Sequence, residues 1–152
     1  MPAMLRHACL ALTLVACLLL VLGEFGDLNV LRIGTVDRPD LSQGVGDNHG
    51  YALLVIAVVA ALMAAAAWRT GLRPPAVAVA VLGAVAVLIV LTVDAPDVDA
   101  IGTVGDNYES ASARAATGFK LAATGAVLLL FSGVATALAP SLSGRPERPS
   151  RA

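Results

Sequence analysis

The sequence predicts an all-α integral membrane protein, a bundle of four transmembrane helices made from two parallel helix–loop–helix repeats. Of its 152 residues, 58% are hydrophobic and only 14% are charged, which is about half the charge of an average soluble domain. The apolar residues form four blocks, each about as long as a helix that crosses a bilayer. These blocks cover approximately residues 4–23, 51–68, 75–93 and 119–138.

A repeated motif divides the chain into two halves. Ile33-Gly34-Thr35-Val36 returns 68 positions later as Ile101-Gly102-Thr103-Val104, and the same offset relates Gly50-Tyr51 to Gly118-Phe119. We therefore expect two repeats of helix, outer acidic loop and helix, residues 1–70 and 71–139, followed by a disordered cytoplasmic tail, residues 140–152. Because both halves would cross the membrane in the same direction, they would be related by an axis along its normal.

The two motif copies are candidate interaction or structural segments. Their Ile, Thr and Val residues favour extended backbone, so we expect short outer β-strands at Ile33–Val36 and Ile101–Val104. A two-fold axis between the halves would bring these segments side by side in antiparallel pairing. The alternative is that they are separate surface loop segments that common ancestry has kept alike.

The first apolar block has two other interpretations, a lipoprotein signal that ends at Cys17 and a plain cleaved signal peptide. We expect it to be retained as a helix, because its apolar run continues through residues 18–22 and has a counterpart in the second half. Cys9 and Cys17 would lie about 12 Å apart on that helix, which is too far for a mutual disulfide.

The basic residues predict the orientation. Since positive charge gathers in cytoplasmic segments, we expect a multi-pass protein of the plasma membrane with both termini in the cytoplasm and two acidic loops outside. The arginines that fall on one side are Arg6, Arg69, Arg73, Arg145, Arg148 and Arg151.

Acidic residues in the second loop are weak candidates for a metal site, because carboxylate oxygens are the ligands that Ca²⁺ prefers. These candidates are Asp94, Asp97, Asp99, Asp106 and Glu109. Their spacing matches no EF-hand loop, and acids are also typical of a solvated outer loop, which we favour. His49 is interpreted as a surface loop residue, and no cofactor is expected.

Small residues recur every four positions on three of the predicted helices and favour close helix packing. The stripes are Ala57, Ala61 and Ala65; Ala76, Ala80 and Ala84; and Gly118, Ala122 and Ala126. We expect them to pack within one bundle, with Val79 on another face, although a dimer or partner face is the alternative.

The Gly50-Tyr51 and Thr117-Gly118-Phe119 sequences open apolar helices, and this layout resembles small four-span membrane proteins of unknown function that are common in actinobacteria. Claudins share the topology of two outer loops and inner termini. They carry a Trp and two Cys in the first loop, however, and this loop has neither, so we reject that family.

The sequence favours a non-enzymatic protein. It shows no nucleophile with a partner, no Walker loop, no haem or zinc spacing and no charged residue deep within a predicted helix. We expect an accessory or scaffold subunit that contacts membrane lipids and other membrane subunits, or a second copy of itself, and not nucleic acid. The alternatives are an outward-facing cation or ligand sensor that uses the acidic loops, and a subunit of an oligomeric channel or transporter.

Overall fold

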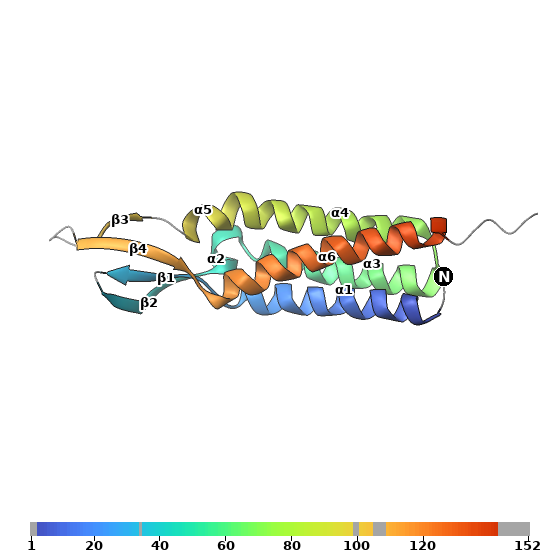
Figure 1. Ribbon diagram of the computed structural model, residues 1–152, viewed down its shortest axis with the longest axis horizontal. Helices are drawn as coiled ribbons and strands as arrows, with labels where there is room; N and C mark the ends of the chain where they lie inside the picture. The colour runs from blue at the N-terminus through green and yellow to red at the C-terminus, as the bar shows by residue number, and fades with distance from the viewer. Residues whose placement is uncertain (1–2, 34, 99–100, 105–108, 143–152) are drawn as a thin grey trace, which may run out of the picture.

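A computed structural model describes residues 3–33, 35–98, 101–104 and 109–142. Four long helices lie side by side and form most of the molecule (Figure 1): α1 (Ala3–Glu24), α3 (Ala52–Thr70), α4 (Arg73–Ile89) and α6 (Thr117–Leu142). Each belongs to a segment that is long and apolar enough to cross a membrane, Met4–Glu24, Ala52–Thr70, Arg73–Val98 and Thr117–Leu138. The prediction of a four-helix membrane bundle is therefore confirmed.

Close backbone contacts hold the bundle together. The α6 helix packs against both α1 and α4, and α3 packs against the same two helices from the other side. A Cβ atom added to Gly83 of α4 would lie 2.4 Å from the backbone nitrogen of Leu130, and one added to Gly133 of α6 would lie 2.4 Å from that of Ala80. The two backbones touch because neither glycine has a side chain, as is common between membrane helices.

The predicted small-residue stripes are confirmed on α6 and only partly on α3 and α4. Gly118, Ala122 and Ala126 are all buried, whereas Ala76 is buried, Ala80 half-buried and Ala84 exposed. Each step of four residues turns about 40° beyond a full turn of an α-helix, so on α4 a strict spacing of four leaves the packed face after two steps, whereas on α6 all three residues stay buried. The stripe of Ala57, Ala61 and Ala65 drifts in the same way.

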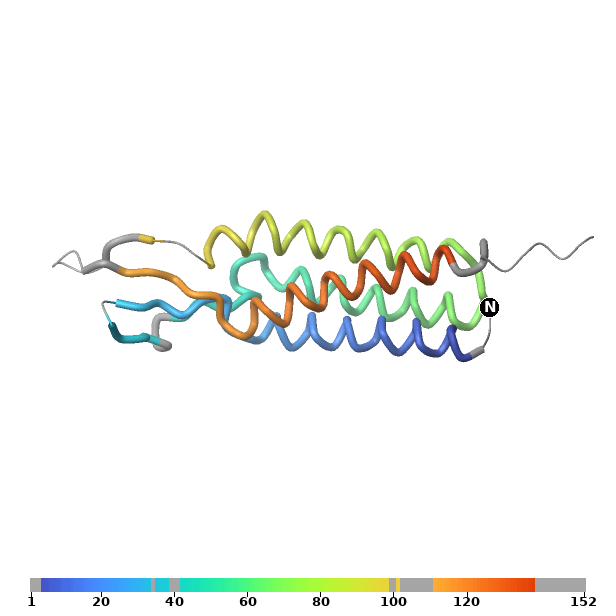
Figure 2. Tube along the Cα trace, in the orientation of Figure 1, coloured from blue at the N-terminus to red at the C-terminus, as the bar shows by residue number. Residues whose placement is uncertain are grey.

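A four-stranded sheet extends beyond one end of the bundle (Figures 1 and 2). Its strands are β1 (Asp27–Ile33), β2 (Val36–Gly44), β3 (Ile101–Val104) and β4 (Glu109–Ala115). They lie in the order β2-β1-β4-β3, and each neighbouring pair is antiparallel. The two predicted outer loops therefore form one structure, because β1 pairs with β4 across the halves of the chain.

The expected pairing of the two motif copies is wrong. Ile101–Val104 is a strand, β3, but Ile33 ends β1 and Val36 begins β2, so the first copy forms the turn of a hairpin. Gly34 lies outside the described residues. Strand β4 separates the copies, since its Ala111 pairs with Ile33 on one side and with Gly102 on the other. The second copy thus pairs with the strand that follows it, β4, and the first copy lies where the consecutive strands β1 and β2 meet, in agreement with the usual pairing of sequential strands.

Short helical segments join the bundle to the sheet. The helix α2 (Val45–His49) lies between β2 and α3, while α4 continues into a π-helix, η1 (Val90–Asp94), and then into α5 (Ala95–Val98). At the other end of the bundle, Gly71 adopts a left-handed conformation, with φ of 68°, in the tight turn between α3 and α4. The helix α6 continues past Pro140, and residues 143–152 of the predicted tail lie outside the described residues.

Candidate functional site

Three ionisable side chains meet where the bundle joins the sheet, and we call them the acid–histidine cluster: Glu24, His49 and Asp94. They are the last residues of α1, α2 and η1, respectively. His49 Nδ1 lies 3.7 Å from Glu24 Oε1, and His49 Nε2 lies 3.5 Å from Asp94 Oδ2. Both carboxylates are fully buried, and the imidazole is only 6% exposed. One imidazole ring therefore stands between two buried carboxyl groups.

Local backbone structure holds α2 close to the end of α1. The Val45 N–H donates a hydrogen bond to the Gly26 carbonyl at 3.0 Å. A Cβ atom on Gly46 would lie 2.6 Å from Cε1 of Tyr51, so only glycine fits beneath that ring. Gly50 and Tyr51, with φ of 61° and 59°, reverse the chain from α2 into α3. A left-handed conformation costs a residue with a side chain about 1–2 kcal/mol, and Tyr51 adopts it two residues after His49.

Further hydrogen bonds tie the two acids to neighbouring segments. The Leu54 N–H, in the first turn of α3, donates to Glu24 Oε1 at 3.4 Å. Asn48 Nδ2 donates to Asp94 Oδ1 and to the Val93 carbonyl, each at 3.2 Å. The cluster thus connects the ends of α1, α2, α3 and η1.

The cluster has more acceptors than donors. Glu24 Oε2, Asp94 Oδ2 and both ring nitrogens of His49 are buried and have no hydrogen-bond partner among the described residues. A neutral imidazole has one N–H donor and one acceptor, whereas an imidazolium has two N–H donors. A proton added to His49 would therefore give the ring a donor for each carboxyl group and a charge that attracts both.

The geometry does not suit a metal ion. No group of three or more His, Cys, Asp or Glu side chains in the described part of the chain is arranged to hold one. In the cluster, the two carboxyl groups approach opposite nitrogens of one ring, and so they do not surround a common point.

The structure brings only two of the acids proposed as weak metal candidates close together, Asp94 and Asp97. Asp94 belongs to the cluster, and Asp97 is a half-buried residue of α5 whose carbonyl accepts a hydrogen bond from Asn29. Glu109 begins β4, while Asp99 and Asp106 lie outside the described residues.

Sequence reasoning missed the cluster as a unit. The interpretation of His49 as a surface loop residue, based on the lack of another His or a Cys close to it in the sequence, is wrong, since the side chain is buried. One signal was present: Glu24, His49 and Asp94 each adjoin the same end of a predicted helix, so a bundle would bring them to one level. An ionisable group near the apolar part of a membrane protein is a reason to suspect a functional site.

Comparison with known proteins gives no match: no protein-family model matches the chain, and no curated protein or solved structure is significantly similar to it. The resemblance to four-span actinobacterial proteins therefore stays a prediction. The function must be inferred from the geometry of this chain alone.

Proposed function

We propose that the protein is a non-enzymatic accessory subunit of a membrane complex and that its sheet contacts the partner. The observation that carries this proposal is a single-layer sheet that stands beyond the bundle. Helices α2, α5 and α6 contact the sheet, and Figure 1 shows no helix alongside its far half. A sheet with one apolar face is stable when another layer covers that face, so a second protein is a suitable cover.

One face of this sheet is mostly apolar. Leu31 pairs with Ala113, and Ile33 pairs with both Ala111 and Val36, which places these five side chains on the same face. Arg38, which pairs with Leu31, is a charged residue of that face. The residues that alternate with them on β1 and β4 lie on the opposite face and are mostly polar: Val30, Arg32, Ser112 and Arg114. Val36 is 59% exposed, so the apolar face reaches the surface at the hairpin.

Photocrosslinking tests the contact. A photoreactive phenylalanine analogue at Val36 is expected to form a reproducible covalent product in intact membranes, because this position would lie against the partner. Ile101, which is 87% exposed and pairs with Ser112 on the opposite face, is the matched control. Mass spectrometry identifies the partner in the product. A product with twice the mass of this chain contains a second copy of it. No product at Val36, or equal products at both positions, would contradict the proposal.

We also propose the parallel-repeat arrangement and the cytoplasmic placement of both termini in a plasma membrane. Asn29 Nδ2 donates to the Asp97 carbonyl at 3.0 Å, and these residues are 68 positions apart, which is the offset of the repeat. Equivalent positions meet in this way close to an axis that relates two halves. For the orientation, Arg6, Arg69 and Arg73 lie at the end of the bundle opposite the sheet, where positive charge favours the cytoplasm.

Labelling tests this orientation. In a background without Cys9 and Cys17, a single cysteine at Asp37, an exposed position of β2, is expected to react with an impermeant thiol reagent in intact cells. A cysteine at Leu72, which is exposed in the turn between α3 and α4, is expected to react only after the membrane is opened. The reverse pattern would mean that the sheet lies in the cytoplasm.

The acid–histidine cluster favours a second function, an outward-facing response to protons. The ionisable groups that face this site are Glu24 of α1, His49 of α2, Asp94 of η1 and Asp97 of α5. Protonation of His49 would add attraction between α2 and the two acids on either side of it. Because α2 follows β2 directly in the chain, a firmer hold on α2 would also fix the base of the sheet.

A further inference from the structure

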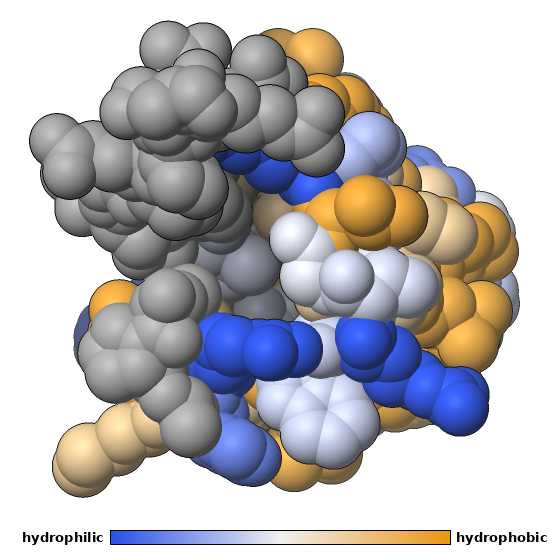
Figure 3. Space-filling model, turned by 90° about the vertical axis from the view of Figure 1, so that its right-hand side faces the viewer, coloured by the Kyte–Doolittle hydropathy of each residue, from blue (hydrophilic) through white to orange (hydrophobic). Residues whose placement is uncertain are grey.

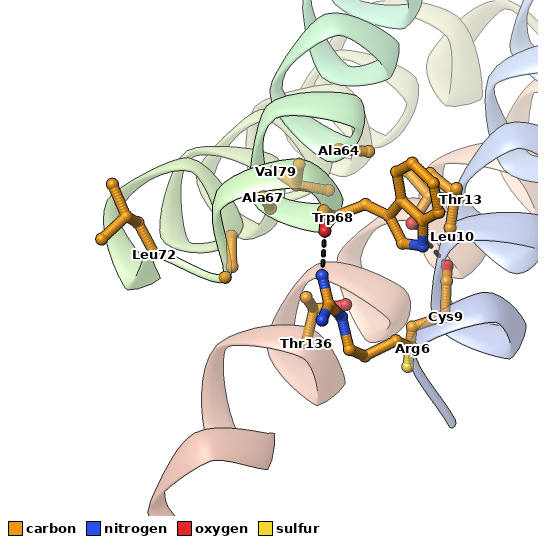
Figure 4. A pocket seen from close by; sticks show the side chains of 12 residues that line it. Arg6, Cys9, Leu10, Thr13, Ala64, Ala67, Trp68, Leu72, Val79 and Thr136 are labelled. Carbon is orange, nitrogen blue, oxygen red and sulfur yellow. Dashed lines mark hydrogen bonds between the residues drawn. The ribbon is translucent and has the colours of Figure 1, made fainter. Parts of the chain in front are cut away.

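The end of the bundle opposite the sheet contains a cavity of about 290 Å³ between the helices (Figure 4). Its walls are mostly apolar and come from α1, α3 and α4, with residues such as Leu10, Ala64, Ala67, Ala76 and Val79. Thr136 adds a wall from α6. This volume is at the lower limit of ordinary ligand pockets, and its lining suits a hydrocarbon group.

A basic cavity adjoins the apolar one. Arg6, His7, Trp68 and Arg69 line a second space of about 330 Å³, and Arg6 and Trp68 line both cavities. The Arg6 guanidinium donates a hydrogen bond to the Trp68 carbonyl across the opening (Figure 4). The His7 ring meets the Trp68 indole edge-on, with ring centres 5.8 Å apart. Figure 3 faces this end of the molecule and shows hydrophilic surface next to hydrophobic surface.

We propose that the two cavities together bind one anionic glycerophospholipid, with an acyl chain between the helices and the phosphate against Arg6 and Arg69. A guanidinium has five N–H donors, so Arg6 can bond the Trp68 carbonyl and a phosphate oxygen together. Basic pockets between membrane helices suit anionic headgroups. A soluble anion would not fill the apolar cavity, and a neutral lipid would not use the positive charge of Arg6 and Arg69. Trp68 also fits the depth of the headgroups, where tryptophan concentrates.

Trp68 provides the readout, because it is the only tryptophan in the chain and lines both cavities. The full-length protein is placed in phosphatidylcholine bilayers that contain a small fraction of lipid with brominated acyl chains, which quench indole fluorescence on contact. Brominated phosphatidylglycerol is expected to quench Trp68 at a mole fraction at least ten-fold lower than brominated phosphatidylcholine. Equal quenching by the two lipids would overturn the proposal.

Two kinds of variant separate the headgroup from the acyl chain. The double variant Arg6→Gln/Arg69→Gln is expected to lose the preference for phosphatidylglycerol, whereas Arg114→Gln, which removes a charge from the exposed surface of β4, is expected to keep it. Ala64→Leu fills the apolar cavity and leaves both arginines in place, so it is expected to reduce the quenching by phosphatidylglycerol to the level of phosphatidylcholine.

Each outcome of these variants decides between a built site and general attraction of lipid to positive charge. A preference that survives in the double variant would show that the arginines do not hold the headgroup. A preference that survives in Ala64→Leu would show that no acyl chain enters the cavity. Should Ala64→Leu fail to fold, as judged by thermal melting, Thr136→Leu fills the same cavity from α6 at a half-buried position, and the same two results apply.

Discussion

Replacing His49 by glutamine is expected to lower the free energy of unfolding by about 3 kcal/mol, because removal of the group between two buried carboxyl groups leaves them uncompensated. Glu24 and Asp94 are both fully buried on either side of the ring. Thermal melting in a mild detergent measures the loss. Asp47→Asn is the matched control, since Asp47 is exposed on the same short helix and its replacement is expected to change the melting temperature little.

Hydrogen exchange at two pH values shows whether the effect is one of protonation. Because an imidazolium has an N–H donor for each carboxyl group, the ratio of the protection of the α2 backbone amides at pH 5.5 to that at pH 8 is expected to exceed one, after correction for intrinsic exchange. In His49→Gln this ratio is expected to fall to about one. The triple variant Glu24→Gln/His49→Gln/Asp94→Asn removes the buried charges together and is expected to regain stability without the response to pH. A pH ratio that persists in His49→Gln would exclude His49 as the proton-responsive group, and one that persists in the triple variant would exclude the cluster.

Replacing Gly83 by leucine is expected to prevent assembly of the bundle or to destabilise it severely. Overpacking a core with extra methylenes typically costs about 1–3 kcal/mol and occasionally more. Here the obstacle is backbone, since even a Cβ atom would lie 2.4 Å from the nitrogen of Leu130. The helices α4 and α6 would have to separate along their contact. The measurement is the yield of monodisperse protein from membranes, followed by its melting temperature.

Ala84→Leu is the control for this substitution, because it adds a side chain of the same kind one residue further along α4. Ala84 is exposed on the outer side of the bundle, so its leucine would face lipid and is expected to leave the yield and the melting temperature nearly unchanged. If Ala84→Leu were the more damaging of the two, the packed face of α4 would differ from the one described.

The transmembrane part of the fold was predictable because it depends on the length of the apolar blocks. The positions of single residues on the helix faces were less predictable, as Ala84 shows, because several registers of small residues fit the same alanine-rich helix. The buried faces of α4 and α6 are defined by Gly83 and Gly133, which form the closest contact between the two helices. Neither glycine belongs to a predicted stripe.

The sheet was largely missed for two different reasons. The β2 segment contains Pro39 and several polar residues, a composition more typical of a turn than of a strand. Proline is usual only at edges and irregularities of a sheet, and β2 is indeed an edge strand. In β4, Ala111, Ala113 and Ala115 alternate with polar residues, which is the period of a half-buried strand. Alanine is a weak strand former, and so the alternation was easy to overlook.

The cluster depends on contacts between distant parts of the chain. Its members are separated by 25 and 45 residues, and each alone looks like the charged end of an apolar helix. What sequence reasoning lacked was the position of α2, which the Gly46–Tyr51 contact and the left-handed Gly50 and Tyr51 fix against α1. Backbone conformations of that kind are set by tertiary packing and leave little trace in composition.

The π-helical conformation of η1 determines which changes in chain length this segment tolerates. A π-turn behaves as an α-helix with one additional residue, and each residue turns an α-helix by about 100°. Loss of a single residue between Val90 and Val93 would therefore let α4 continue as an ordinary α-helix with Asp94 still directed toward His49. Insertion of one more residue, which the existing π-turn does not absorb, would instead turn Asp94 about 100° away from His49. The acid would then be disconnected from the imidazole without a change in any of the three side chains, so in this segment the two changes in chain length have opposite consequences.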